Sequence, residues 1–329
     1  MVWFKAWIQA LEDVPAVVTF EENDVCVGLM FLQVRDQQTG PFKWKTAWVN
    51  QTGLQDFDQV WIEYNSVICQ ENIEQDCIQA FFRLLPKLKV NELNVSMTDS
   101  EARWLGAAKR VNWKSESEAV YAASKQLESV SKILTTYSKN TRYQVKRAMK
   151  LLTEKYGDIN VKVAKGNEEK AHFFSELSEL HIQRWQHTSE GSGFTNPAFI
   201  RHHEYLLSHA PDMTEIVRVD AGDTTLGYCL NFICNKHVSF YCSGIRYSDD
   251  DNKMKPGYVV HHCLMQEYAR RGMLSYDFLG GFSQYKASLS DRTYQFHTLR
   301  FTSPTIKGYA LLWLRACKKR VKALTERLA

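Results

Sequence analysis

The strongest structural signal in the chain lies in residues 237–286, which read HVSFYCSGIRYSDDDNKMKPGYVVHHCLMQEYARRGMLSYDFLGGFSQYK. Their pattern predicts, in order, a strand, a polar loop, a helix and a second strand, over residues 237–245, 249–255, 258–271 and 275–279. Gly272 follows the helix, at the position where glycine commonly ends one. Residues 237–279 are long enough for one right-handed strand–helix–strand unit, so two parallel strands with a crossover helix are expected.

The same order of elements occurs in both halves of the chain. Upstream of this unit, strands are predicted over residues 215–219 and 226–234, joined by turn residues 221–224. The first half gives two strands, a short third strand, a helix and a further strand, over residues 25–34, 43–49, 60–64, 72–85 and 93–97. The residues do not repeat but the topology does. The sequence therefore predicts two similar α/β halves, each a mixed sheet with helices on its faces.

Further helices are predicted around these halves. One covers roughly the first dozen residues, and the others lie over residues 116–134, 141–156, 168–185, 197–209 and 307–328. The segment 139–155 is strongly basic, with Lys139, Arg142, Lys146, Arg147, Lys150 and Lys155 against Glu154 alone. The predicted domains are a degenerate first half, a catalytic second half that includes this basic helix, and a basic amphipathic terminal helix, over residues 1–115, 116–306 and 307–329.

The composition is that of an ordinary globular chain of 329 residues. No apolar run approaches the ~20 residues of a membrane-spanning helix, and no secretory signal opens the sequence. The net charge of +4 is too weak alone to indicate nucleic acid, so no DNA partner is expected. Eight cysteines without CxxC spacing indicate reduced thiols and a cytoplasmic location. The spacing of Cys229, Cys234, His237 and Cys242 fits no standard zinc site, so no metal is expected.

Several catalytic motifs are missing from the sequence. It has no GxGxxG after a strand, no Walker loop, no HExxH and no GxSxG, which disfavours the corresponding redox, nucleotide-hydrolysing and hydrolase chemistries. Pro256 and Gly257 open the predicted helix, whose free N–H groups and partial positive charge favour a phosphate. Asp277 lies in an apolar strand, where an unpaired carboxylate is costly to bury. Tyr285 and Lys286 follow shortly afterwards.

In this region the sequence resembles the GNAT superfamily, in particular the branch of cellulose-biosynthesis (CelD-type) acetyltransferases related to the FemAB peptidoglycan transferases. The resemblance covers about residues 138–290 and rests on the order and spacing of Arg142 with Lys146 and Arg147, Arg184-Trp185, Gly244, Pro256-Gly257, Gly272, Asp277, Gly281 and Tyr285-Lys286. Members often carry an acidic residue just before the Tyr-Lys pair, whereas this chain has Phe282, Ser283 and Gln284. The resemblance implies a tandem double-GNAT fold whose first half is degenerate.

The resemblance also implies acyl transfer from a thioester to an amine, with acyl-CoA, most simply acetyl-CoA, as the co-substrate. The helix start would hold the pyrophosphate, and splayed strands 238–246 and 275–280 would hold the thioester. The implied cofactor-binding residues are Gly244, Pro256, Gly257, Tyr258 and Val259. Asp277 is the candidate base, with a structural role as the alternative, and Tyr285 is the candidate proton donor to the leaving thiolate.

The acceptor implied by the resemblance is a polysaccharide or cell-envelope precursor. Arg142, Arg184 and Lys286 are candidates to bind an acidic acceptor, such as a nucleotide-linked or lipid-linked sugar, and Trp185 is a candidate wall of the cleft. Two other functions stay open. One is a FemAB-type transferase with aminoacyl-tRNA as donor, and the other is a non-catalytic GNAT-like module whose basic helices contact nucleic acid or anionic lipid.

Overall fold

The computed structural model describes residues 1–188, 191–247 and 254–328, and it divides into two compact units. Unit 1 contains Met1–Leu11 and Tyr121–Tyr294, and unit 2 contains Glu12–Val120 and Gln295–Ala329. The predicted domains were contiguous, with boundaries after residues 115 and 306, so they differ from these units. The difference arises because helix α1 (Val2–Ala10) packs on α8 (Pro197–His209), and because the C-terminal segment follows strand β12 (Arg292–Thr302) into unit 2.

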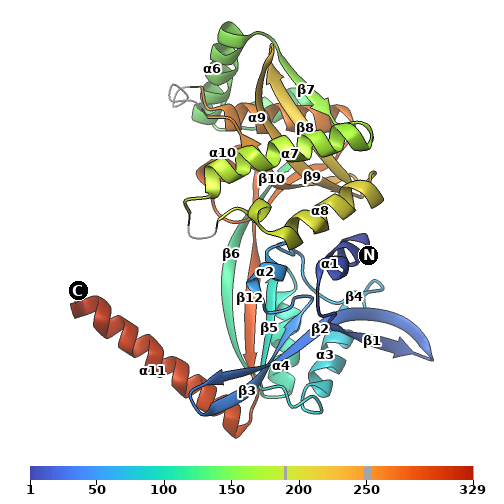
Figure 1. Cartoon of the computed structure of the whole chain (residues 1–329), viewed down its shortest axis with the longest axis vertical. Coiled ribbons are helices and arrows are strands. Elements are labelled where there is room, and N and C mark those ends of the chain that lie inside the picture. Colours follow the sequence, from blue (N-terminus) through green and yellow to red (C-terminus); the bar gives the residue numbers. More distant parts are fainter. Residues whose placement is uncertain (189–190, 248–253, 329) are drawn as a thin grey trace. The chain divides into compact units, whose positions relative to one another are not determined.

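Unit 1 is built on a mixed sheet with strand order β6-β11-β10-β9-β8-β7 (Figure 1). The strands are β6 (Lys114–Gln126), β7 (Ile159–Val163), β8 (Thr214–Ala221), β9 (Thr224–Cys234), β10 (His237–Ile245) and β11 (Ser275–Gly280). The helices after α1 are α5 (Val130–Thr135), α6 (Lys139–Tyr156), α7 (Gly166–Trp185), α8, α9 (Pro256–Arg270) and α10 (Gln284–Leu289). β10 and β11 pair in parallel with α9 as their crossover, as residues 237–279 predicted.

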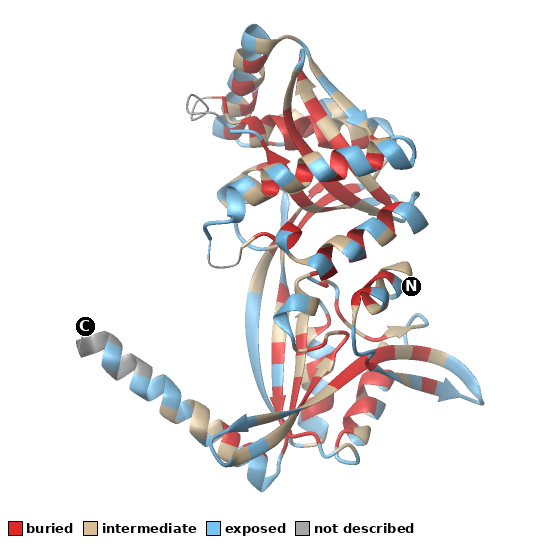
Figure 2. Cartoon of the chain, viewed as in Figure 1, coloured by how far each residue is buried: buried red, intermediate tan, exposed pale blue. Residues whose placement is uncertain are grey.

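Both faces of this sheet are covered by helices (Figure 2). Alternation along the strands divides the apolar residues between two cores, so that Val217 packs with α5, α6 and α9 while Ile216 packs with α7 and α8. The first core includes Val259 and Tyr276, and the second includes Phe199.

Unit 2 repeats the topology of unit 1. Its strands β1 (Ala16–Glu22), β2 (Val25–Thr39), β3 (Phe42–Val49), β5 (Glu92–Thr98) and β12 follow the order β1-β2-β3-β5-β12, and β4 (Ile68–Cys69) pairs with β2. The helices are α2 (Gln55–Asp58), α3 (Glu74–Leu84), α4 (Glu101–Arg110) and α11 (Ile306–Leu328). Because β3 and β5 are parallel and α3 lies between them in sequence, the predicted pair of similar α/β halves is confirmed.

Two predicted elements are wrong. The helix predicted over residues 116–134 is strand β6 followed by the short helix α5, and the strand predicted over 60–64 does not form. The Glu- and Ala-rich composition of 116–123 favours helix, but pairing of β6 with its sheet neighbours β12 and β11 overrides this weak propensity. Trp61 and Tyr64 both have positive φ (41° and 55°), which breaks an extended strand.

Within the described ranges, no helix combines the length and the hydropathy needed to cross a lipid bilayer.

Candidate active site

Strands β10 and β11 separate shortly after they begin. Residues 237–239 of β10 pair with residues 275–277 of β11, and the described ladder between the two strands ends there, although β10 continues to Ile245. Each strand carries an irregularity at this point, between Phe240 and Cys242 in β10 and between Asp277 and Gly280 in β11. Bulges bend a strand away from its neighbour, so two bulges at the same level open the sheet into a fork.

Asp277 stabilises the bend of β11. Leu279 adopts a left-handed conformation (φ 58°), and its backbone N–H donates to Asp277 Oδ1 at 2.9 Å. The Tyr294 hydroxyl lies 2.7 and 2.6 Å from the two carboxylate oxygens. The sequence offered Asp277 as a base or as a structural group, and these contacts favour the structural role. Tyr294 was not singled out from the sequence, since no motif surrounds it.

The start of α9 lies beside a cluster from two other elements. Pro256 and Val259 are buried, and Val259 belongs to the core, which leaves Gly257 and Tyr258 as the partly exposed members of the first turn. A Cβ atom on Gly257 would lie 3.2 Å from the Tyr247 hydroxyl. The Arg184 guanidinium, at the end of α7, lies 5.2 Å from the centre of the Tyr247 ring. The structure thus brings Arg184 and the unpredicted Tyr247 to the helix start.

Tyr285, in α10, stacks on a buried histidine. Its ring lies 5.1 Å from that of His261 at an interplanar angle of 11°, and the His261 Nδ1 atom lies 3.1 Å from the Tyr276 hydroxyl. Burial raises the pKa of Tyr285 above its usual value, and neighbouring Cys229 and Tyr247 add to this effect. Burial lowers the pKa of His261 to about 3. At neutral pH both rings are therefore uncharged, and Tyr285 retains its proton.

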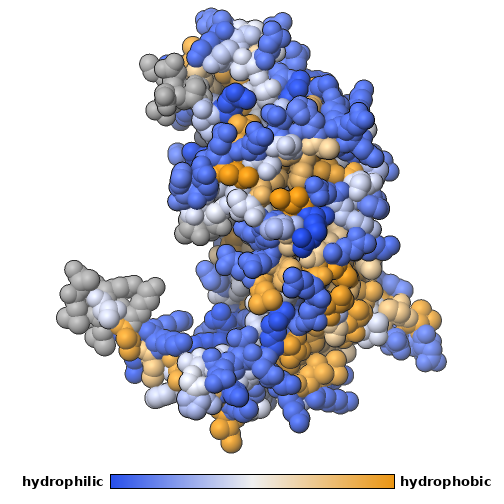
Figure 3. Space-filling view, viewed as in Figure 1, coloured by the Kyte–Doolittle hydropathy of each residue, from blue (hydrophilic) through white to orange (hydrophobic). Residues whose placement is uncertain are grey.

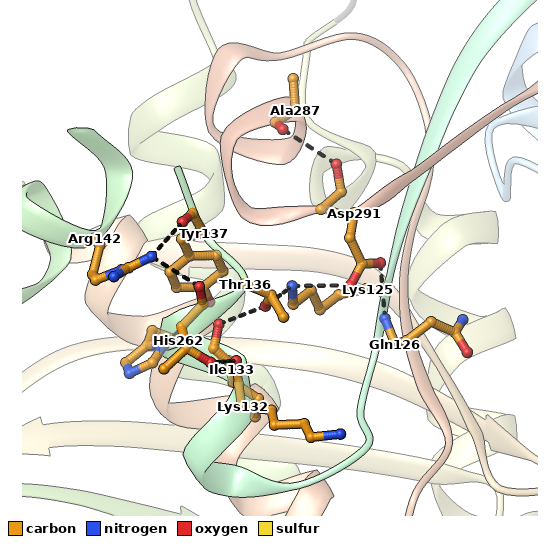
Figure 4. A network of polar contacts seen from close by, with 12 residues as sticks. Lys125, Gln126, Lys132, Ile133, Thr136, Tyr137, Arg142, His262, Ala287 and Asp291 are labelled. Carbon is orange, nitrogen blue, oxygen red and sulfur yellow. Dashed lines mark hydrogen bonds and ion pairs between the residues drawn. The ribbon is translucent and has the colours of Figure 1, made fainter. Parts of the chain in front are cut away.

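A partly buried polar network contacts the segment just after α10 (Figure 4). The Lys125 ammonium, on β6, lies 3.0 Å from an Asp291 carboxylate oxygen, donates to the Thr136 hydroxyl and lies 5.1 Å from the centre of the Tyr137 ring. Asp291 also accepts from the Gln126 backbone N–H at 3.1 Å. Since Asp291 follows α10 by two residues, this network ties the helix that carries Tyr285 to the sheet.

The other predicted residues have local partners. Arg142 donates to the backbone carbonyls of Thr135 and Tyr137 at 2.8 and 3.2 Å. Lys286 Nζ donates to the carbonyl of Gly280 at 2.8 Å. These contacts stabilise the fold.

Trp185 is the last residue of helix α7, and Gly244 of β10 packs against the same helix. Trp185, 40% exposed, lies on α7 with its ring 6.0 Å from that of His181. A Cβ atom on Gly244 would lie 2.7 Å from the Leu177 carbonyl oxygen, so this glycine lets α7 approach β10 closely. Most of the predicted polar loop 249–255, namely residues 249–253, lies outside the described residues.

Residues 139–287 match the family model described as an acetyltransferase (GNAT) domain. The match covers less than half of the chain, and over this segment the chain is similar to a GNAT acyltransferase domain. The predicted α/β double-GNAT class of fold and the acyltransferase class of enzyme are confirmed, and the resemblance to the GNAT superfamily is supported over residues 139–287. The cellulose-biosynthesis branch stays a prediction.

Nearly the whole chain is similar in fold to solved structures. FemX matches with a TM-score of 0.56 and 10% identity, covering 90% of each chain. The C-terminal domain of a putative lysylphosphatidylglycerol synthetase from Agrobacterium fabrum matches with a TM-score of 0.55 and 10% identity, covering 94% of this chain and 90% of that one. L-PGS from Bacillus licheniformis matches with a TM-score of 0.52 and 11% identity over the same shares. No curated protein matches the sequence.

Proposed function

We propose that the protein is an acyl-CoA-dependent N-acyltransferase that acts on an amino group of a polysaccharide or cell-envelope precursor. The observation that carries this proposal is the fork between β10 and β11, which begins after Ser239 and Asp277. The edges of the strands that face each other across the fork carry backbone N–H and C=O groups outside the described ladder. Such groups can bind the amide-containing arm of the donor and stabilise the oxyanion.

The reaction forms one bond and breaks another. The amine nitrogen attacks the thioester carbonyl carbon, the C–N bond forms, and collapse of the tetrahedral intermediate breaks the C–S bond. The amine must be neutral to attack, and water is the acceptor for the proton it loses, because the contacts of Asp277 favour a structural role. Tyr285 donates a proton to the leaving thiolate and regains one from the water that accepted the amine's proton; its raised pKa means that the phenol is protonated before the transfer.

The donor's pyrophosphate fits the start of α9. The N–H groups of the first turn and the positive end of the helix dipole favour a phosphate there. The absence of a side chain at Gly257 lets a phosphate approach the backbone, and Arg184 supplies a positive charge beside Tyr247. Arg184 is therefore assigned to the donor in this proposal, rather than to the acceptor that the sequence suggested.

A second donor, aminoacyl-tRNA, is favoured by one observation. Helix α6 presents a basic hollow lined by Tyr143, Lys146, Arg147, Lys150, Leu151 and Glu154, with a volume of about 420 Å³. A basic surface with an exposed aromatic ring suits a phosphate backbone. The fold likeness to FemX agrees with this alternative.

Binding of acetyl-CoA, measured by isothermal titration calorimetry, tests the proposal. Gly257→Asp places a carboxylate at the helix start, which favours the helix but repels the pyrophosphate, so binding should weaken at least about tenfold without loss of fold. Gly106→Asp is the matched control, because this glycine has open space around it and lies in unit 2. No binding of any acyl-CoA, together with transfer from charged tRNA, would establish the alternative.

Turnover tests the proton donor separately. Tyr285→Phe should lower kcat by about 10²–10⁴-fold with little change in KM for the donor, since only the leaving thiolate loses its partner. Equal kcat in the variant and the parent would remove Tyr285 from the mechanism.

A further inference from the structure

Helix α11 (Ile306–Leu328) is fixed to unit 2 by one side only. Gly308 and Leu311 are buried on that side, and a Cβ atom on Gly308 would clash with the Ser303 carbonyl. Arg315 forms an ion pair with the buried Glu92 on β5. With about 100° of rotation per residue, Leu311 and Arg315 lie close together on the helix surface, so they define the docked side.

The opposite side of α11 exposes large apolar side chains. Ile306 is 90% exposed, Trp313 67%, Val321 60% and Tyr309 54%. Their positions fall within an arc of about 120° that faces away from Leu311. Scattered exposed apolar residues are common on proteins, but four of them aligned on one helix, away from its packed side, form an interaction surface.

The charges on α11 are almost all positive. Lys307, Lys318, Lys319 and Arg320 are exposed, and the sequence contains no Asp or Glu between residues 306 and 325. Lys307 and Lys318 lie at one flank of the apolar arc, where long side chains can reach toward an interface. Apolar and polar side chains lie side by side along the part of α11 visible in Figure 3.

We infer that α11 lies on a lipid surface that carries negative charge, with Ile306, Tyr309 and Trp313 inserted at the level of the headgroups. A helix with aromatic and aliphatic residues on one side and Lys and Arg beside them binds in the plane of the interface. Each basic residue near an anionic leaflet strengthens binding. A second copy of the chain fits less well, because residues 306–325 of its α11 contain no Asp or Glu that could pair with the Lys and Arg residues. Nucleic acid would leave the apolar arc without a partner.

Co-sedimentation of the full chain with phospholipid vesicles tests this inference, which does not depend on the acyl donor. We expect binding to phosphatidylcholine vesicles that contain about one third phosphatidylglycerol, and much weaker binding to phosphatidylcholine alone. The triple variant Lys318→Gln, Lys319→Gln, Arg320→Gln should bind about 100-fold more weakly. The matched control, Lys87→Gln, Lys89→Gln, Lys109→Gln, removes the same charge from other exposed positions of unit 2 and should bind like the parent.

The apolar arc is tested separately from the charge. Ile306→Ala with Trp313→Ala should weaken vesicle binding at least about tenfold while the melting temperature stays unchanged, since both residues are exposed. Val14→Ala with Val17→Ala changes exposed apolar residues of unit 2 outside α11 and serves as the control.

Several outcomes would overturn the inference. These are equal binding to both kinds of vesicle, vesicle binding that neither α11 variant changes, and a dimer in light scattering that the Ile306 and Trp313 variant dissociates. Binding of tRNA that depends on Ile306 and Trp313, without vesicle binding, would assign the surface to nucleic acid and also reject it.

Discussion

Removing Asp291 from the Lys125–Asp291 ion pair should destabilise the fold more than removing Lys125. The Lys125 side chain is 1% exposed, whereas that of Asp291 is 29% exposed. Asp291→Asn leaves the Lys125 ammonium buried beside the Thr136 hydroxyl and the Tyr137 ring, without a negative partner. An uncompensated buried charge of this kind lowers the free energy of unfolding by about 3–5 kcal/mol. Lys125→Met keeps most of the apolar stem and leaves a carboxylate that reaches water and still accepts from Gln126, so it should cost about 1 kcal/mol.

The assay is hydrogen exchange of peptides covering residues 121–137, because a chain with two units need not unfold in one step. The double variant should be more stable than Asp291→Asn alone, since it removes the buried charge together with its partner. Lys132→Met with Glu128→Gln is the matched control, because this pair is exposed (62% and 63%) and should leave exchange unchanged.

The reasoning would be refuted if the two single variants lost equal stability, or if the double variant were as unstable as Asp291→Asn. A functional readout accompanies the stability measurement. Because Asp291 anchors the end of α10, both single variants should lower kcat through misplacement of Tyr285 while KM for acyl-CoA changes little.

Three further predictions concern unit 1. Burial lowers the pKa of His181, His202, His203, His261 and His262, several of them to about 4. The unfolded chain therefore binds more protons below pH 6.5, so the melting temperature of unit 1 should fall steadily between pH 6.5 and 4; a constant value in calorimetry would contradict this. Gly244→Ala should lower the free energy of unfolding by about 1–3 kcal/mol, because the added methyl group forces α7 away from β10. Gly106→Ala, at a helical position with open space around it, should raise the free energy of unfolding by about 0.5–1 kcal/mol; urea unfolding measures both. Tyr294→Phe leaves Asp277 with one hydrogen-bond donor fewer and should lower the free energy of unfolding by about 1–3 kcal/mol. If the melting temperature of Asp277→Asn equals that of the parent while its kcat falls sharply, Asp277 is the catalytic base instead.

Local patterns predicted most of unit 1. Helices with a clear apolar stripe, such as 141–156 and 258–271, lie within about two residues of their predicted bounds, because amphipathic periodicity and a terminal glycine are properties of the segment itself. Strand β6 was missed because its identity depends on pairing with β11, which local composition does not encode.

The sequence predicted only those parts of the site that are encoded by local motifs. The start of α9 and Tyr285 follow from motifs along the chain. Tyr247, His261 and Tyr294 lie in segments without a motif, and their contacts arise only when distant elements fold together. Arg142 was predicted to bind an acidic acceptor, but in the structure it donates hydrogen bonds to two backbone carbonyls. The basic run around it gives no indication of these contacts.

The chain passes from one unit to the other three times, after residues 11, 120 and 294. During synthesis, α1 leaves the ribosome long before α8, against which it packs. The sheet of unit 2 lacks β12 until residues 292–302 have been made. Unit 1 is therefore complete only after residue 294 has been made, and unit 2 is completed still later. A cut at any single peptide bond between residues 12 and 294 yields no fragment that contains a whole unit.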